Sequence, residues 1–461
     1  MTAGVVLALW AAIHILAHPG LQAGAGTAAH NLCSSIFVSR LPEQQTEKEM
    51  IGLLVGPTAG LLRYRIDRDS RTVEATLLSA HARAVFTPGY GCRLDFGHPA
   101  PALPPVEAIP FADDAFAPPG LVQTDNATLR AALDREFEDA PGAAPRRVKA
   151  VVIVKDGHVV AERYADGFGI AAPMMSFSVA KSFTNALLGI LVRQGRIDMD
   201  QPAAVPEWRR AGDQHGDQSG DQRGKITSND LLRMASGLDA AESGSGFDPA
   251  SQMFYNADDM GAYGAARPAR RPAQSEWEYT SVNTLILDRE IRALVGGGAP
   301  ELRRFAEKEL FAPLGMRNVT LEFDGAGTFL GASHVYAPAR EFARFGLLYL
   351  NDGVAPDGRR ILPEGWVAYS RKSTLGSPYG AGFWTNDGPG KQAAWLVAHG
   401  FPKDGFFASG NLGQRIYIIP SERMVVTRFG YSSGPDFAIE EDMALLSSAI
   451  AALKSPGVNR P

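Results

Sequence analysis

A serine and a lysine three residues apart precede an apolar segment near the middle of the chain. Ser178 and Lys181 would fall on one face of a helix, where their side chains can touch. A lysine that is desolvated among apolar neighbours has a depressed pKa, and its neutral amine can take the proton of a serine hydroxyl. The pair therefore predicts a nucleophile with its general base. The same spacing also fits a capping serine beside a lysine whose stem lies along the surface.

The segment that carries this pair is predicted to be a helix that follows a β-hairpin. Apolar residues recur after Lys181 at the spacing of one helical face, at Phe183, Ala186, Leu187, Ile190 and Leu191. Gly195 is a suitable C-terminal stop. Upstream, Asp156 and Gly157 separate two β-rich runs, which is a strong hairpin signal. Ser178 is thus expected in the first helical turn, where free backbone amides favour negative charge nearby.

Length and composition are those of a globular enzyme. The 461 residues exceed what one hydrophobic core usually fills, and 45% hydrophobic with 21% charged residues argue against global disorder. A formal charge of -5 provides no basic field for a nucleic acid. The nine histidines are scattered and no Cys-Xaa-Xaa-Cys or His-Glu-Xaa-Xaa-His motif occurs, so no metal ion or cofactor is expected.

The N-terminus carries an apolar run from Val5 to Ala17. This run is too short to span a bilayer and has the length of a signal-peptide core. The small residues Ala23–Ala25 offer a cleavage site, although no lysine or arginine precedes the run. We expect residues 1–25 to be a signal peptide or membrane anchor, and the protein to be periplasmic, secreted or membrane-anchored. A buried first helix of a cytosolic protein is the alternative.

Residues 26–140 are predicted to be an N-terminal extension of unknown role, followed by one catalytic domain over residues 141–461. The extension is rich in proline, glycine and alanine and shows no recognisable chemistry. Its Cys33 and Cys92 are the only cysteines of the chain. In an exported protein they could form a disulfide, which the loop-entropy model values at roughly 3 to 4 kcal/mol. Two unrelated buried thiols are the alternative.

Three segments, in this order, resemble the serine β-lactamase and penicillin-binding-protein superfamily. They are Ser178–Lys181, Ile226–Asp239 with its Met-Xaa-Ser-Gly turn, and the segment around Tyr279. Within that superfamily the segments most resemble those of class C β-lactamases and of nylon-oligomer (6-aminohexanoate-dimer) hydrolases. The resemblance covers roughly residues 145–455. The resemblance implies an α+β fold with a mainly antiparallel sheet flanked by helices, a mostly helical lobe, and the site between them. No Gly-Xaa-Ser-Xaa-Gly elbow occurs, which argues against an α/β-hydrolase.

The resemblance also implies roles for individual residues. Tyr279 would share proton transfer with Lys181, and the backbone N–H groups of Ser178 and Asn411 would hold the oxyanion. No metal ion is needed for this chemistry. The further substrate-binding candidates are Tyr255, Ser281, Asn283, Trp384, Ser409 and Gly410.

Two departures from the lactamase pattern bear on the substrate. Ser281 stands where lactamases have asparagine after their tyrosine, and Ala408–Gly410 replaces their Lys-Thr-Gly. The missing lysine would hold the carboxylate of a β-lactam, so a dedicated β-lactamase or transpeptidase is disfavoured. We expect a serine hydrolase of small amides or esters, of the aminohexanoate-dimer type. A carboxylesterase or D-aminopeptidase-like enzyme, and an inactive lactamase-like binding or sensor protein, are the alternatives.

Overall fold

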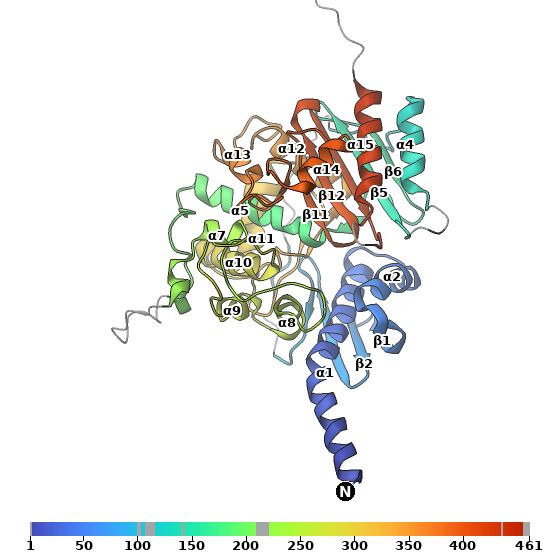
Figure 1. Cartoon of the computed structure of the whole chain (residues 1–461). Helices are drawn as coiled ribbons and strands as arrows, with labels where there is room; N and C mark the ends of the chain where they lie inside the picture. Colours follow the sequence, from blue (N-terminus) through green and yellow to red (C-terminus); the bar gives the residue numbers. More distant parts are fainter. Residues whose placement is uncertain are drawn as a thin grey trace, which may run out of the picture.

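The computed structural model describes residues 2–98, 103–106, 116–139, 142, 144–208, 221–434 and 437–454, with the backbone alone for residues 2–15. It has three parts (Figure 1). A sheet with helices on both faces forms one part, a mostly helical lobe lies beside it, and an N-terminal unit with a long helix lies at the base. This arrangement confirms the predicted α+β fold.

The central sheet is antiparallel and has six strands in the order β10-β11-β12-β13-β5-β6. Their bounds are β5 Val148–Lys155, β6 His158–Tyr164, β10 Trp384–Thr385, β11 Phe406–Gly410, β12 Gln414–Ile419 and β13 Met424–Gly430. The predicted hairpin at Asp156 and Gly157 joins β5 to β6, and both turn residues have positive φ. Asp-Gly suits this turn because both residues tolerate the left-handed region.

The strands are apolar on both faces because both faces are covered. In β5, Val152 and Val154 face one core while Val151 and Ile153 face the other. The first core contains α5 (Ala180–Arg193) and α12 (Ala339–Leu350), and the second contains α4 (Ala127–Phe137) and α15 (Ile439–Leu453). An alternating strand pattern is expected only where one face meets water, so these strands form continuous apolar runs instead.

The helical lobe follows α5 in the chain and contributes most of the remaining helices. It contains α7 Ser228–Leu232, α8 Pro249–Asn256, α9 Met260–Ala265, α10 Ser281–Val295 and α11 Ala299–Ala306. A three-stranded sheet, ordered β7-β9-β8, adjoins it and consists of β7 Pro173–Met175, β8 Thr320–Leu321 and β9 Val335–Pro338. Two short helices, α13 Trp366–Arg371 and α14 Lys391–Ala398, precede the last strands.

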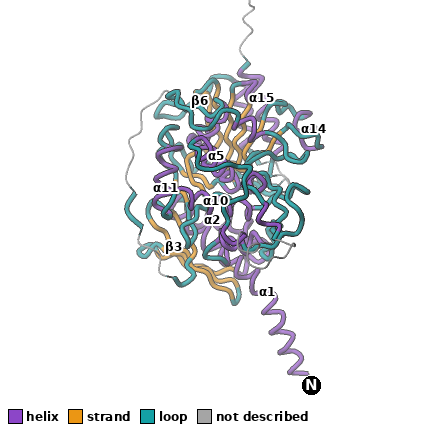
Figure 2. Tube along the Cα trace, turned by 90° about the vertical axis from the view of Figure 1, so that its left-hand side faces the viewer, coloured by secondary structure: helices purple, strands orange, loops and turns teal. Residues whose placement is uncertain are grey.

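The N-terminal unit combines helix α1 (Thr2–Cys33) with a four-stranded antiparallel sheet. The strands are β1 Leu62–Asp67, β2 Thr72–Leu77, β3 Ala80–Thr87 and β4 Gly91–Leu94, and the short helices α2 Glu43–Thr46 and α3 Gly52–Val55 precede them. The first turns of α1 project from the body of the protein (Figure 2). Its later turns pack on β2 and β3.

The predicted leader and extension do not stand apart from the rest of the molecule. The small residues Ala23–Ala25 lie inside α1, and Ala23 and Ala25 are buried. The core of the N-terminal unit also includes Phe177, in the turn directly before α5, and Leu412, in the turn directly after β11. No helix among the described residues is both long and apolar enough to cross a membrane. Cleavage of a leader at this point stays a prediction.

Cys33 and Cys92 form a disulfide that joins the end of α1 to β4. Their Cα atoms are 6.1 Å apart, and the bond joins positions 59 apart in the sequence. We expect the double variant Cys33→Ser, Cys92→Ser to lose about 4 kcal/mol of unfolding free energy, because the unfolded chain gains the entropy of the open loop. Urea denaturation of the variant and of the oxidised wild type measures the difference. A loss below about 1 kcal/mol would contradict the loop-entropy account.

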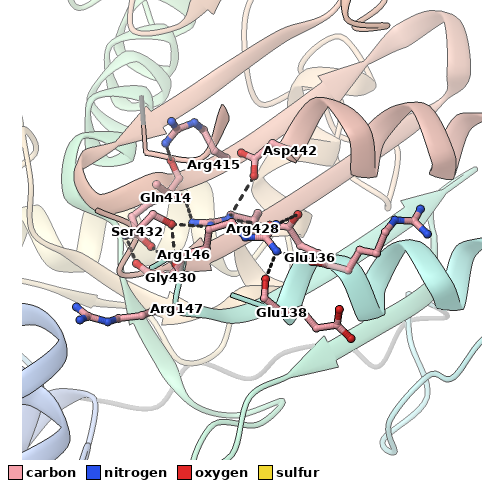
Figure 3. Close-up of polar contacts among 12 residues, drawn as sticks. Glu136, Glu138, Arg146, Arg147, Gln414, Arg415, Arg428, Gly430, Ser432 and Asp442 are labelled. Atoms are coloured by element: carbon pink, nitrogen blue, oxygen red, sulfur yellow. Dashed lines mark hydrogen bonds and ion pairs between the residues drawn. The ribbon is translucent and has the colours of Figure 1, made fainter. Parts of the chain in front are cut away.

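A buried charge network ties α4 to the sheet and to the last helix (Figure 3). Arg428 on β13 is fully buried, and its Nε lies 3.3 Å from Glu136 and 3.4 Å from Asp442. The same guanidinium donates to Ser432 Oγ and to the carbonyl of Gly413. Glu136 is the penultimate residue of α4. Helix α4, which precedes the boundary predicted near residue 140, is thus bonded to the central sheet.

Candidate active site

Ser178 lies in a 3-10 turn, Phe177–Val179, directly before α5. Phe177 has φ of 43°, in the left-handed region that a phenylalanine rarely adopts. The end of β11 lies against this turn, since a Cβ on Gly410 would be 2.4 Å from the carbonyl oxygen of Ser176 and 3.1 Å from the nitrogen of Ser178. Only glycine at 410 permits this approach. The predicted nucleophile is thus held on a constrained turn beside a strand end.

Lys181 is buried and directs its amine at the serine. Its Nζ lies 3.1 Å from Ser178 Oγ, 2.9 Å from Ser281 Oγ and 3.1 Å from the carbonyl oxygen of Ala332. The side chain is 1% exposed. Burial lowers the pKa of Lys181 to about 8, although the negative charges of Glu242 and Asp288 oppose this shift. A lysine with this pKa can exchange a proton with the serine near neutral pH.

Tyr279 completes the predicted group of three. Burial, followed by the negative charge of Glu242, raises the pKa of its phenol above the ordinary value, while a hydrogen bond with Ser178 opposes the rise. Its ring lies 4.8 Å from Lys181 Nζ and stacks on Trp384 at 5.7 Å. The phenol is therefore a proton donor at neutral pH that contacts the nucleophile. The structure brings Ser178, Lys181 and Tyr279 together, although about one hundred residues separate the tyrosine from the pair.

Ser281 and Asn283 differ in what they reach, although both were substrate-binding candidates. Ser281 accepts a hydrogen bond from Lys181 and lines the same cavity as Ser178. Asn283 is 1% exposed, and its side chain contacts Ser236 Oγ at 2.9 Å and Met234 Sδ. Two residues along α10 turn the side chain by about 200°, so Asn283 points away from the cavity. Asn283 is not among the described residues that line the cavity, so the structure gives no support for its predicted role in substrate binding.

Some of the other substrate-binding candidates line the cavity, and others do not. Asn411 and Tyr255 line the cavity with Ser178. Gly410 acts through its close approach to the serine turn, and Trp384 acts by stacking on Tyr279. Ser409 lies beside Arg415 of β12 and is not among the described residues that line the cavity, so direct contact with the substrate is not supported.

Asn411 and Ser178 supply the backbone N–H groups expected to form an oxyanion hole. Leu412, the residue after Asn411, has φ of 58°, so a left-handed residue flanks each predicted donor. The side chain of Asn411 accepts a hydrogen bond from the N–H of Leu412 at 2.9 Å. The end of β11 thus faces the turn that carries Ser178. Two backbone N–H groups held in this way can donate hydrogen bonds to the oxygen that becomes negative during the reaction.

Sequence reasoning missed Glu242 and the carbonyl of Ala332. Glu242 Oε2 accepts the N–H of Ser281 at 2.5 Å, and its charge acts on both Lys181 and Tyr279. Glu242 lies three residues beyond Asp239, the end of the second resembling segment, and only that proximity could have marked it. A backbone carbonyl such as that of Ala332 has no residue-type signal at all.

A cavity of about 770 Å³ opens beside Ser178. Ser281, Ala332 and Asn411 line its catalytic end, and residues of α1 and of the segment 53–58 line part of the remaining wall. This volume lies in the range of small-molecule sites. The N-terminal unit therefore forms part of the active-site wall, which composition alone did not indicate.

His30, Glu322 and His334 form a buried group near the cavity whose side chains could be considered as metal ligands. The two imidazole rings stack at 4.5 Å with 11° between their planes. Nitrogen lone pairs lie in the ring planes, so parallel stacked rings do not converge on one ion. Glu322 instead accepts hydrogen bonds from Ser34 Oγ and the Cys92 N–H, each at 2.7 Å. The group thus bonds the N-terminal unit to the catalytic part.

Comparison with known proteins adds an independent line of support. The family model "Beta-lactamase" matches residues 130–449. The 6-aminohexanoate-dimer hydrolase of Paenarthrobacter ureafaciens is 27% identical over 357 residues, which cover 72% of this chain and 83% of that protein. Penicillin-binding protein 4 of Amycolatopsis lactamdurans is 25% identical over 333 residues, covering 63% and 81%.

Solved structures show the same fold. A putative 6-aminohexanoate-dimer hydrolase from Bacillus anthracis superposes with a TM-score of 0.57 at 20% identity, covering 76% of this chain and 89% of that one. A penicillin-binding protein homologue from Caulobacter crescentus gives a TM-score of 0.56 at 18% identity, covering 72% and 99%. Since the family model extends over most of the chain and the buried Lys181 amine contacts the Ser178 hydroxyl, the protein belongs to the β-lactamase family and is a serine hydrolase.

Proposed function

We propose that this protein cleaves amide bonds of small molecules through an acyl-enzyme formed on Ser178. The observation that carries the proposal is the buried Lys181 amine, which lies 3.1 Å from Ser178 Oγ and has its pKa lowered to about 8. The name of its relative from Paenarthrobacter ureafaciens supports a linear amide substrate. Esters react through the same acyl-enzyme, so carboxylesterase activity is the second expectation.

The mechanism follows from the contacts of each group. Neutral Lys181 takes the proton of Ser178 while Oγ attacks the carbonyl carbon, and the oxygen that gains negative charge accepts N–H hydrogen bonds from Ser178 and Asn411. Tyr279 and Lys181 pass the proton to the leaving nitrogen as the C–N bond breaks. Water then attacks the acyl-enzyme, gives up a proton to the same groups and releases the acid. Serine regains its hydrogen in this last step.

Covalent labelling tests the nucleophile and separates an enzyme from an inactive binding protein. We expect a fluorophosphonate to add once to wild type, and peptide mapping by mass spectrometry to place the adduct on Ser178. Ser178→Ala should remain unlabelled, whereas Ser333→Ala, which changes another serine that lines the cavity, should label like wild type. An adduct on a different residue, or no adduct, would contradict the proposed nucleophile.

The pH dependence of hydrolysis tests the base. Because the pKa of Lys181 is lowered to about 8, the neutral amine becomes about tenfold less abundant for each pH unit below that value. We expect kcat/KM for a neutral substrate to rise about tenfold from pH 6 to pH 7 and to level off above pH 8. A profile that is flat or falling over this interval would contradict the role of Lys181 as general base.

We also infer that the protein works in an oxidising compartment. The Cys33–Cys92 disulfide supports this inference, since such bonds persist mainly in exported proteins. Alkylation of the protein as isolated from its native cells, followed by mass spectrometry, should find both cysteines protected. Two alkylated thiols would contradict the inference.

A further inference from the structure

The wall of the catalytic cavity opposite the helical lobe comes from the N-terminal unit. Ala17, Gly20, Leu21 and Gly24 of α1 line it, together with residues 53–58. Ser178, Ser281 and Asn411 line the same cavity at its catalytic end. The space along α1 is therefore continuous with the nucleophile.

Among the residues that the structure describes, this wall is mainly apolar and carries no positively charged side chain. Its larger side chains are apolar: Leu21, Leu53, Leu54, Val55 and Leu77. Leu53, Leu54 and Val55 are only half-buried, so part of their surface faces the cavity. Among the described residues that line the cavity, Glu242 is the single charged one, and its carboxylate already accepts the N–H of Ser281.

The wall is built by close packing and hydrogen bonds. A Cβ on Gly20 would lie 2.4 Å from the ring of Phe247, so glycine lets α1 touch the loop 244–247 that borders the cavity. Gln252 and Asn256 of α8 donate to the carbonyl of Pro19 at 3.2 and 3.1 Å. These contacts fix α1 against the catalytic part at the level of the cavity.

We propose that the cavity takes an uncharged ester or amide with an apolar chain, and that this chain lies along α1 against the segment 53–58. The proposal rests on the proposed function and specifies its substrate class. Burial of methylene groups against this wall is favourable, whereas a substrate carboxylate would lose its hydration there without a cation to pair with. The chemistry therefore differs from that of a dimer of an amino acid, which carries a charge at each end.

Chain-length series test the proposal on the full-length oxidised protein. The probes are p-nitrophenyl esters with acyl chains of two to twelve carbons, and acetate esters with alkyl leaving groups of the same lengths. Each buried methylene is worth about a fourfold gain in kcat/KM. We expect kcat/KM in at least one of the two series to rise at least thirtyfold from two-carbon to eight-carbon chains. This total assumes that the chain is only partly buried.

Substitutions in the wall connect the chain-length preference to its proposed place. Leu54→Asp puts a charge on the wall and should reduce the ratio of eight-carbon to two-carbon kcat/KM at least tenfold. Phe247→Ala, at a side chain that is 56% exposed, should reduce the same ratio with little risk to folding. The matched control is Leu61→Asp, since Leu61 is 51% exposed and lies outside the cavity lining. This control should keep the wild-type ratio.

The outcomes separate the two proposals. Hydrolysis that depends on Ser178 but shows no chain-length preference in either series would overturn the apolar-chain inference alone. The same inference fails if Leu54→Asp and Leu61→Asp give equal ratios. Absence of Ser178-dependent hydrolysis for every ester and amide, with no fluorophosphonate adduct, would overturn the proposed function itself.

Discussion

Replacement of Ser178 by alanine should lower kcat/KM for amide and ester hydrolysis by at least about 10⁴-fold. The hydroxyl oxygen of Ser178 forms the bond of the acyl-enzyme and lies 3.1 Å from the Lys181 amine, and alanine has no atom that can form this bond. The rates of ester hydrolysis by wild type and variant, measured at known enzyme concentrations, provide the comparison. The substitution removes one small polar atom from the cavity surface, so the unfolding midpoint should change little.

A matched serine elsewhere controls for nonspecific effects. Ser447→Ala alters a serine of α15, which donates to the carbonyl of His399 on the far side of the sheet. This variant should hydrolyse at the wild-type rate. If Ser178→Ala retained more than a tenth of wild-type activity while Ser447→Ala behaved normally, the nucleophile would lie elsewhere.

Replacement of Lys181 by methionine should lower kcat/KM at least about 10³-fold without loss of stability. Methionine keeps the length of the stem but cannot accept the proton of Ser178, and general acid-base catalysis contributes roughly 10² to 10⁴. Burial of the amine destabilises the folded protein, and the lowering of its pKa to about 8 reflects this cost. The variant should therefore unfold at the same or a higher denaturant concentration than wild type, as is common when a catalytic group is removed.

An exposed lysine provides the control for Lys181. Lys225→Met, at an exposed position at the end of a short 3-10 turn, should alter neither activity nor stability. Activity of Lys181→Met within tenfold of wild type would assign the base role to another group. The residual activity of Lys181→Met should also lack the rise between pH 6 and pH 8, since the titrating amine is absent.

The catalytic group could be predicted from the sequence because its members occur in segments with strong local patterns. Ser178 and Lys181 precede a periodic helix, and Tyr279 lies shortly before α10 in a segment that resembles a known motif. The sheet hairpin at Asp156 was equally clear, since its turn chemistry is local. Such features depend on neighbours within a few residues, which a single sequence displays in full.

Features that depend on long-range packing were predicted poorly. Asn283 has a residue type suited to substrate binding, yet its amide is taken up by Ser236, 47 positions earlier in the chain. The attachment of Glu136 to the central sheet depends on Arg428, 292 positions later. The cysteine pair was predicted only as one of two alternatives, because spacing alone does not reveal that Cys33 and Cys92 meet.

Helix α1 carries the apolar run that predicts an export leader, and it also forms one wall of the cavity, so cleavage of this helix would alter the active site. A cut after Ala25 would remove Ala17, Gly20 and Leu21 from the border of the cavity and free the loop at Phe247 from its contact with Gly20. Leader removal would thus be a maturation event that changes which molecules fit, rather than simple trimming. N-terminal sequencing of the purified native enzyme would therefore show whether its active-site cleft keeps the wall formed by α1 or is open on that side.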